Sequence, residues 1–208
     1  MEQLILVRHG ATRANLDRPY WIQGKGRDEP LVPVGLQQAQ AVRDYLRSWP
    51  ITAVVTSPLQ RARRTAEIVA EPHGLEVRVI ESLHEGDVGR WEGRTWDEIQ
   101  AADPEEYARF TADPGTHGYP GGENFSQVAA RVVPLLSTLL ETHAGQSVVV
   151  VGHQITHRAF LGHLLGIPAA AARRLRLDNG GVSLVRRAQG QHYLQTLNFT
   201  QHVDGIGA

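Results

Sequence analysis

The chain has 208 residues, 41% of them hydrophobic and 21% charged, with a formal net charge of -1 at pH 7. These values are typical of one globular domain and exclude bulk electrostatic binding to nucleic acids or membrane surfaces. The chain has no cysteine, which excludes disulfides, thiolate metal sites and cysteine nucleophiles. With no apolar run long enough for a membrane span and no pattern of a secretory signal, we expect a cytoplasmic protein.

The first expected strand ends in a charged and polar tripeptide. Residues 4–7 are all apolar, which is typical of a strand buried on both faces. Arg8, His9 and Gly10 follow directly, and ligands bind at the carboxyl ends of strands in open α/β sheets. Gly10 is expected to let the backbone turn sharply away. The tripeptide is therefore a candidate site, although a strand that simply ends in a polar loop would begin in the same way.

The next segment, residues 16–34, is polar and rich in turn-forming residues, which indicates a loop. Trp21 within it either covers the mouth of a pocket or packs on the surface. A helix over 35–49, a strand over 51–56 and a helix from Ser57 to about residue 70 are expected next. Ser57 is the predicted cap of that second helix. Strand–turn–helix geometry directs Arg61 toward the same sheet edge as His9.

The middle of the chain contains a glycine-rich loop and a lid-like insertion. We expect a strand over 75–80, a structured loop over 83–93, short helices over 96–101 and 104–112, and a loop over 113–122. Residues 100–123 are interpreted as a lid-like insertion. A long amphipathic helix is predicted over 125–143, with a kink or break at Pro134.

The last part of the chain contains another buried strand that ends in a histidine. The strand covers 147–151 and leads into Gly152 and His153. Helices over 155–165 and 169–177, a hairpin over 182–197 and a loose tail over 199–208 complete the prediction. The alternation indicates one α/β domain over residues 1–208. Its expected fold is a three-layer sandwich, with a mostly parallel central sheet flanked by helices and an antiparallel edge from the hairpin.

Three expected strand ends bring His9, Arg61 and His153 to one sheet edge, with the Glu85 loop nearby. Arginine and histidine suit a phosphoryl group, whose oxygens take charge-assisted hydrogen bonds. A neutral histidine can form a covalent intermediate, and a carboxylic acid can protonate the leaving oxygen and then activate water. The chain has no Walker loop, which argues against a common nucleotide-triphosphate site.

Several ordered blocks carry a resemblance to a known family. They are residues 8–10, Asn15, Gln23 with Gly24, residues 57–62 with 65–66, Leu83 and Glu85 with 89–93, residues 121–123, and residues 151–153. In these blocks the chain resembles the histidine phosphatase superfamily, the phosphoglycerate mutase-like proteins. The segment between the acid and the second histidine is shorter than in the mutases, so the chain is more similar to the phosphatase branch.

The resemblance implies a role for each matching residue. His9 would be the nucleophile, with a backbone carbonyl on its other ring nitrogen to fix the tautomer. Glu85 would be the general acid and then the base. Arg8, Arg61 and His153 would clamp the phosphoryl oxygens, with His153 largely protonated beside a phosphate dianion. Asn15, Gln23, Gly24 and Gln154 are the expected substrate-binding residues. No metal or cofactor is implied; the expected partners are a small phosphorylated substrate and a second copy in a homodimer.

Some alternatives stay open at this stage. Gln154 replaces a glycine that is frequent after the second histidine in the family, and it is expected to contact substrate. His153 and His157 have the spacing of a zinc motif, but that motif's glutamate is Gln154 here. We interpret His157 as a structural histidine. A mutase and a non-catalytic phosphate-binding relative are the remaining rivals. The loop residues expected to select the substrate are Trp21, Gln23, Arg90, Tyr119 and Gln154.

Overall fold

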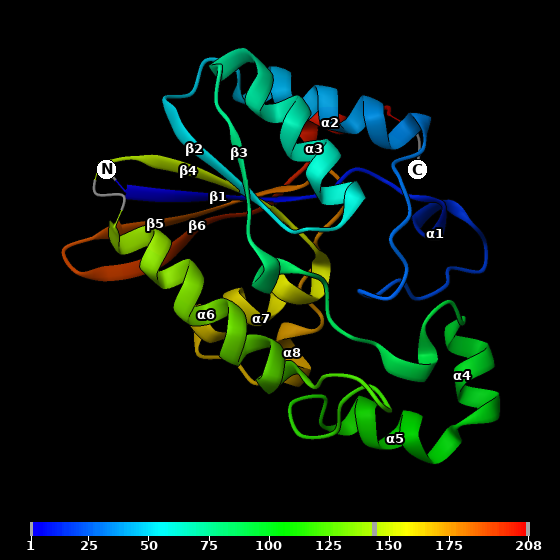
Figure 1. Cartoon of the computed structure of the whole chain (residues 1–208). Helices are drawn as coiled ribbons and strands as arrows, with labels where there is room; N and C mark the ends of the chain where they lie inside the picture. The colour runs from blue at the N-terminus through cyan, green and yellow to red at the C-terminus, as the bar shows by residue number, and fades with distance from the viewer. Residues whose placement is uncertain (1, 143–144, 207–208) are drawn as a thin grey trace.

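A six-stranded sheet lies at the centre of the protein, with strand order β3-β2-β4-β1-β5-β6 (Figure 1). The computed structural model describes residues 2–142 and 145–206. The parallel strands are β1 (Glu2–Arg8), β2 (Ile51–Thr56), β3 (Val77–Val79) and β4 (Ser147–Gly152). The antiparallel edge consists of β5 (Val182–Ala188) and β6 (Gln191–Phe199). The predicted mostly parallel sheet is confirmed.

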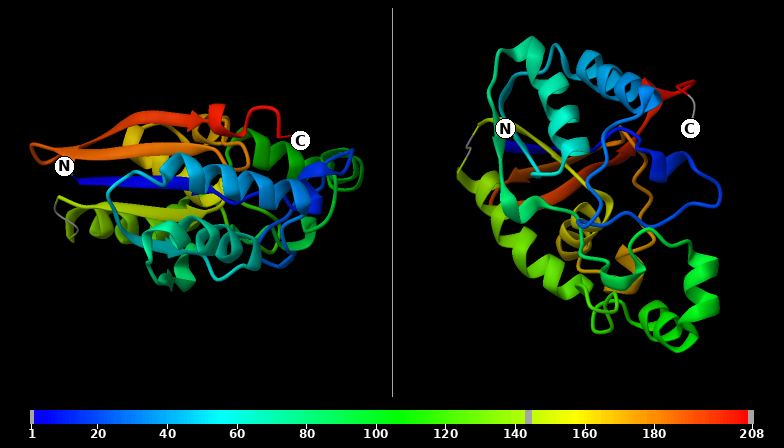
Figure 2. Two further views of the ribbon diagram at one scale, coloured as in Figure 1. Left: turned by 90° about the horizontal axis from the view of Figure 1, so that it is seen from above. Right: turned by 45° about the vertical axis from the view of Figure 1, so that its right-hand side comes forward.

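Helices cover both faces of this sheet. One face carries α2 (Pro33–Leu46) and α3 (Gln60–Ala70), and the other carries α6 (Phe125–Thr142) and α7 (Gln154–Leu165), as Figures 1 and 2 show. Ile5 and Val7 of β1 belong to the core under α2 and α3. Leu4 and Leu6 belong to the core under α6 and α7. Because neighbouring strand residues point to opposite faces, a strand between two helical layers is apolar at every position.

Two short helices stand apart from these layers, beyond the sheet (Figure 1). They are α4 (Trp96–Ala102) and α5 (Pro104–Ala112), close to the predicted bounds. Their rings pack together, with Phe110 in edge contact with Trp91 at 5.3 Å and beside Tyr119 at 4.6 Å. Thr95 caps α4 through a reciprocal bond with Glu98. These rings join the segment expected as a lid to the hydrophobic core on the α6 and α7 side of the sheet.

Shorter elements complete the described chain. They are α1 (Arg13–Leu16), α8 (Ala169–Ala172) and the 3₁₀ turns η1 (Glu71–His73), η2 (Glu81–Leu83), η3 (Gly89–Trp91) and η4 (Gln201–Val203). None of the helices in residues 2–142 and 145–206 has the length and apolar character needed to cross a bilayer.

Some predicted helix boundaries were wrong. The helix after β2 begins at Gln60, and Leu59, not Ser57, occupies its N-cap position. The helical stretch expected over 169–177 ends after four residues, and the backbone N–H groups of Arg174 and Leu175 then bond three residues back in a tight turn. The helix α6 continues through Pro134 without a break, since buried residues on both sides of the proline hold it in the core. His143 lies outside the described residues.

The C-terminal segment does not fit the expected loose tail over residues 199–206. Tyr45 of α2 stacks on Phe199 at 5.0 Å and on His202 at 4.8 Å between ring centroids. His202 Nε2 also lies 2.9 Å from the carbonyl oxygen of Gly180, at hydrogen-bond distance. Aromatic stacking therefore fixes this segment on α2. Residues 207 and 208 lie outside the described residues.

Candidate active site

The ends of β1, β2 and β4 bring three predicted residues into contact. Arg8 is opposite Gly152 in the parallel pairing of β1 and β4, so His9 and His153 leave neighbouring strands at the same level. Their ring centroids are 5.1 Å apart. Arg61, in the first turn of α3, donates from Nε to His9 Nε2 over 3.3 Å. The predicted convergence of these strand ends is thus observed.

The hydrogen bonds of His9 determine its tautomer. Nδ1 lies 2.7 Å from the carbonyl oxygen of Gly10, which can only accept, so Nδ1 carries the proton. Nε2 then carries the lone pair, and Arg61 donates to it. Burial, followed by the positive charges of Arg61 and Arg8, lowers the pKa of His9 well below 6.5. The ring is therefore neutral at pH 7, with its nucleophilic nitrogen toward the arginine.

Gly10 allows two backbones to approach each other closely. A Cβ on this residue would collide with the carbonyl group of Gly35 in the first turn of α2. Its own N–H donates to Thr65 Oγ1 over 3.1 Å. Gly10 is not among the residues with positive φ, so the need for glycine comes from this contact and not from a sharp turn. The carbonyl oxygen of His9 accepts from Asn179 Nδ2 over 2.9 Å, which fixes the end of the strand.

Arg61 is 1% exposed and is held by the loop that precedes α2. Its two terminal nitrogens donate to the carbonyl oxygens of Gly24, over 3.0 Å, and Arg27, over 2.9 Å. Glu92 in turn accepts from the N–H groups of Gly24, over 2.7 Å, and Gly26, over 3.1 Å. Both backbone groups of Gly24 thus face the protein. Gly24 does not line the cleft and its carbonyl oxygen holds Arg61, so its expected role in substrate binding stays a prediction.

Arg8 and His153 complete the cationic side of the site. Arg8 donates from Nη1 to the carbonyl oxygen of Leu177 over 2.7 Å. Burial lowers its pKa to about 10, so it stays charged at pH 7. His153 Nε2 lies 2.7 Å from Ser57 Oγ. Among the described residues, the buried atoms Arg8 Nε and His153 Nδ1 have no hydrogen-bond partner.

The charge expected on His153 is not favoured by the protein itself. Burial is the main cause that lowers its pKa well below 6.5, and the charge of Arg61 adds to it. We expected His153 to be largely protonated when a phosphate dianion is bound beside it. The protein's own groups favour the neutral ring, so any protonation there depends on the charge of the ligand.

Glu85 lies at the N-terminus of α7 and is 4% exposed. Its Oε1 accepts from the backbone N–H groups of Gly86, over 2.9 Å, Ile155, over 3.2 Å, and Thr156, over 3.4 Å. The N–H group of Ile155 also lies 3.2 Å from Oε2, and it is the one donor to Oε2 among the described residues. Oε2 is therefore the atom better placed to carry a proton. Main-chain groups orient this carboxyl.

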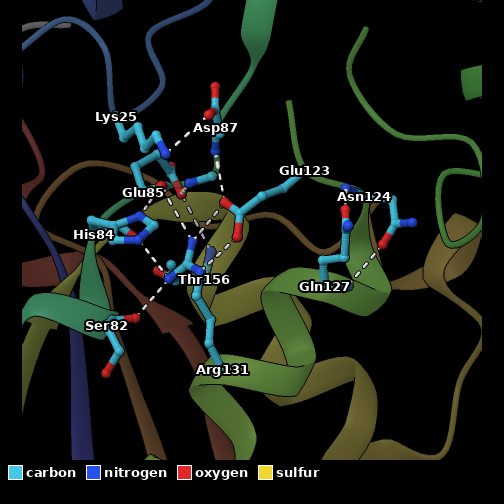
Figure 3. A network of polar contacts seen from close by, with 11 residues as sticks. Lys25, Ser82, His84, Glu85, Asp87, Glu123, Asn124, Gln127, Arg131 and Thr156 are labelled. Carbon is cyan, nitrogen blue, oxygen red and sulfur yellow. Dashed lines mark hydrogen bonds and ion pairs between the residues drawn. The ribbon is translucent and has the colours of Figure 1, made fainter. Parts of the chain in front are cut away.

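A partly buried ion pair supports the loop that carries Glu85 (Figure 3). Arg131 of α6 pairs with Glu123 over 2.8 and 3.0 Å. The same guanidinium donates to the carbonyl oxygens of Ser82, over 2.6 Å, His84, over 2.9 Å, and Glu85, over 3.3 Å. Arg131 thus fixes three main-chain carbonyl groups within residues 82–85. The sequence contains no local signal for it, because Arg131 reads as one polar residue on an amphipathic helix.

A cleft of about 1040 Å³ opens from these residues. Asn15, Gln23 and Gln154 all line it, as expected. The side-chain oxygens of Asn15 and Gln23 both lie within hydrogen-bond distance of the Thr12 hydroxyl, at 3.1 and 2.8 Å. Gln23 Nε2 donates to the carbonyl oxygen of Arg27 over 3.3 Å. Gln154 donates to the carbonyl oxygen of Leu177 over 3.3 Å.

The loop residues expected to select substrate separate into two groups. Trp21 and Tyr119 line the cleft, which answers the open question about Trp21. Arg90 does not line it and instead pairs with Asp103 over 3.3 Å. We call Arg8, His9, Arg61, Glu85 and His153 the reaction centre. We call the side chains that line the cleft beyond it the outer wall: Trp96, Tyr107, Tyr119, Arg158 and Arg173.

His157 lies outside the cleft, packed beneath Gly152. Burial, with a smaller contribution from Arg8, lowers its pKa to about 3, so it is a neutral core residue. Within residues 2–142 and 145–206, no group of three or more histidine or acidic side chains is arranged to hold a metal ion. The two histidines of the zinc-like spacing thus serve different places: His153 faces His9, and His157 packs in the core.

The geometry can be compared with known proteins. A family model of the histidine phosphatase superfamily, branch 1, matches residues 4–200. This chain belongs to that superfamily. The match covers the whole sheet, from the first apolar strand to the end of the hairpin, and it includes all members of the reaction centre.

Similar proteins carry the names of both hydrolases and mutases. A Salmonella choleraesuis protein named probable phosphoglycerate mutase is 38% identical over 193 residues, which are 92% of this chain and 87% of that protein. The alpha-ribazole phosphatase of Shigella flexneri has a TM-score of 0.83 at 31% identity, over 95% of this chain and 96% of that chain. Phosphoserine phosphatase of Entamoeba histolytica, in complex with 3-phosphoglyceric acid, has a TM-score of 0.87 at 30% identity, over 98% and 100%.

Proposed function

We propose that this protein hydrolyses small phosphomonoesters through a phosphohistidine intermediate on His9. The observation that carries the proposal is the fixed tautomer of His9, whose Nε2 lone pair lies 3.3 Å from Arg61 Nε. A neutral, oriented imidazole beside two buried guanidinium groups is suited to attack a phosphoryl group whose charge those groups offset. Phosphorylated metabolites inside the cytoplasm are the natural substrates of such a site.

In the first half-reaction, His9 Nε2 attacks phosphorus and the bond to the ester oxygen breaks. Glu85 gives the proton on its carboxyl group to that oxygen, and the alcohol leaves. Arg8 and Arg61 stabilise the charge on the non-bridging oxygens, and His153 contacts the same group. The hydrogen bond from His9 Nδ1 to the carbonyl oxygen of Gly10 keeps the phosphorylated ring oriented, because neither half-reaction uses the Nδ1 proton.

In the second half-reaction, water replaces the alcohol. The Glu85 carboxylate takes a proton from water, the water oxygen attacks phosphorus, and the bond to Nε2 breaks. Phosphate leaves, and both His9 and Glu85 return to their starting protonation states. The main-chain N–H groups that hold Glu85 are the same in both halves, so one carboxyl position serves as acid and then as base.

We further propose that α4, α5 and the loop over 113–122 act as a lid over the cleft. Trp96, Tyr107 and Tyr119 of this segment line the cleft, and Phe110 of α5 packs against Trp91 of η3. A segment that borders a cleft in this way can shift when substrate binds. Its movement would then exclude bulk water during the first half-reaction.

Rapid-quench experiments test the covalent step. Purified protein mixed with p-nitrophenyl phosphate is expected to release a burst of nitrophenol equal to the enzyme and to carry acid-labile, base-stable phosphate. Peptide mapping should place that phosphate on His9. Catalysis without any phosphoenzyme, under conditions in which the burst is resolved, would contradict the proposal.

The names of the mutase relatives make phosphoryl transfer to a second hydroxyl a specific rival. Incubation with 3-phosphoglycerate, with and without a bisphosphate primer, separates the two reactions. We expect release of inorganic phosphate without accumulation of 2-phosphoglycerate. Primer-dependent isomerisation that exceeds phosphate release would assign a mutase instead.

A further inference from the structure

Two arginines of the outer wall have no role in the reaction described above. Arg158 lies on α7, one turn after Gln154, and Arg173 directly follows α8. Both line the same cleft as His9. Neither forms an ion pair with a carboxylate of the described chain, in contrast to Arg176, which pairs with Asp178 over 2.8 Å. The cleft thus contains cationic side chains without a protein counter-ion.

Each of these guanidinium groups is held in place by a single kind of contact. Arg158 donates from Nε to the carbonyl oxygen of Leu175 over 2.7 Å, so its two terminal nitrogens are not needed for that bond. Arg173 lies over the rings of Phe110, at 4.6 Å, and Trp96, at 5.2 Å. Stacking uses the face of the guanidinium and leaves its N–H edge available to an acceptor.

The electrostatic setting of the two arginines favours an anion between them. Burial lowers the pKa of Arg158, and the charge of Arg173 lowers it further. The Arg158 charge also reaches Arg8 in the reaction centre. Carboxylates oppose part of this repulsion: Glu85 acts on Arg158, and Glu85 and Asp178 both act on Arg8. Within the described residues neither carboxylate forms an ion pair with Arg158 or Arg173, since Asp178 pairs with Arg176 and Glu85 is engaged by main-chain N–H groups. Like charges gathered in a partly buried cleft are stabilised by an anionic ligand.

We propose that Arg158 and Arg173 form a second anion subsite, so that the preferred substrates are phosphomonoesters with a carboxylate or second phosphoryl group at the far end. Planar guanidinium groups bind both acids in bidentate fashion. The aromatic side chains of Trp96, Tyr107 and Tyr119 line the space beside the subsite and suit an uncharged carbon spacer. This inference rests on the proposed hydrolysis and deepens it by naming the substrate class.

A set of synthetic substrates tests the proposal. Three compounds share a primary alkyl phosphate and a three-carbon chain, and end in a hydroxyl, a carboxylate or a second phosphate. A six-carbon set varies the reach. The wild-type protein is expected to show a kcat/KM about tenfold higher for an acid-ended member than for the hydroxyl-ended one, as for loss of one charge-assisted contact. Comparison of the two acid ends identifies whether carboxylate or phosphoryl is preferred.

Variants assign the preference to the subsite. Arg158→Gln and Arg173→Gln are each expected to lower the acid-to-hydroxyl ratio several-fold, while kcat/KM for the hydroxyl-ended compound changes by less than about twofold. Activity on that compound shows that each variant is folded. Arg78→Gln, which removes an exposed arginine of β3 away from the cleft, is the matched control and should leave the ratio unchanged.

Binding measurements separate this proposal from that of hydrolysis. Calorimetry with 4-phosphonobutanoate and butylphosphonate requires no turnover. Tighter binding of the acid-ended phosphonate, lost in Arg158→Gln and Arg173→Gln, supports the subsite even if no phosphate is released. Equal binding of both phosphonates and equal kcat/KM for all chain ends would overturn the subsite, while leaving hydrolysis of the hydroxyl-ended compound to support the proposed function.

Discussion

The reaction centre and the outer wall of the same cleft are held in place in different ways. In the reaction centre, His9, Arg61 and Glu85 are 3%, 1% and 4% exposed, and main-chain groups bind all of them. In the outer wall, Arg158 keeps one main-chain bond, to the carbonyl oxygen of Leu175, whereas Arg173 is only partly buried and is held by ring stacking. Main-chain bonds do not change when a side chain is replaced, whereas stacking does. The chemistry is therefore expected to be rigid and the choice of substrate adjustable.

The largest effect is expected from loss of the nucleophile. His9→Ala should lower kcat for every substrate by about 10⁴-fold or more, because no other group can carry the phosphoryl group. Steady-state hydrolysis of p-nitrophenyl phosphate measures it. His163→Ala, at an exposed position of α7, is the control and should retain activity. Turnover by His9→Ala protein free of wild-type enzyme would show that His9 is not the nucleophile and that the chemistry is not confined to the reaction centre.

The next largest effect is expected from the acid. Glu85→Gln should slow alkyl phosphates by about 10²- to 10⁴-fold, the range for general acid–base catalysis. Aryl phosphates should lose less in the first half-reaction, because their leaving group needs little protonation. Single-turnover phosphorylation rates for the two classes make the comparison, with the exposed Glu81→Gln as control. Equal losses on both classes would show that Glu85 does not protonate the leaving oxygen.

A smaller effect is expected from a residue that acts through Arg61. Glu92→Gln replaces an oxygen that accepts from Gly24 or Gly26 and should loosen the loop whose carbonyls hold Arg61. We expect kcat/KM to fall about tenfold, by the same factor for acid-ended and hydroxyl-ended substrates. Glu76→Gln on the surface is the control. A change in preference between chain ends would place Glu92 with the outer wall instead.

The smallest effect is on stability and comes from His157. Its pKa is about 3 in the folded protein, and the unfolded chain takes up a proton below about pH 6.5. This contribution is therefore complete above pH 6.5 and is lost as pH falls toward 3, at about 1.4 kcal/mol per pH unit. His157→Asn should flatten the loss of unfolding free energy between pH 7 and 5, measured by urea denaturation. The exposed His163→Asn should not; an unchanged slope in His157→Asn would show that His157 titrates normally.

The sheet could be predicted because its signal is local. Each buried strand is a short apolar run, and the hairpin has Gly190 in its turn with positive φ. Because these strands pair in parallel, the positions of His9 and His153 at neighbouring strand ends could be predicted as well. The bonds around the site could not be predicted in the same way. Ser57 has the local pattern of a helix cap, but its hydroxyl bonds to His153, 96 residues away.

Other differences have the same physical origin. Gly24 matches a family block, yet its role depends on where Arg61 and Glu92 lie in space. Arg158 and Arg173 look like charges on solvated helix faces until the fold places them on one cleft. The tail from residue 199 has no periodic pattern, and its place depends on stacking against Tyr45 and on the contact between His202 and Gly180. Contacts between distant segments decided each case.

One crossing segment offers a starting point for redesign. Arg8 and Arg158 both donate to carbonyl oxygens of the chain that follows α8, at Leu177 and Leu175. Those acceptors belong to the main chain, so libraries that vary the neighbouring side chains at positions 173, 174 and 176 can keep both anchors. Such libraries can change which chemical group at the far end of the substrate is bound, while the residues of the reaction centre keep their positions.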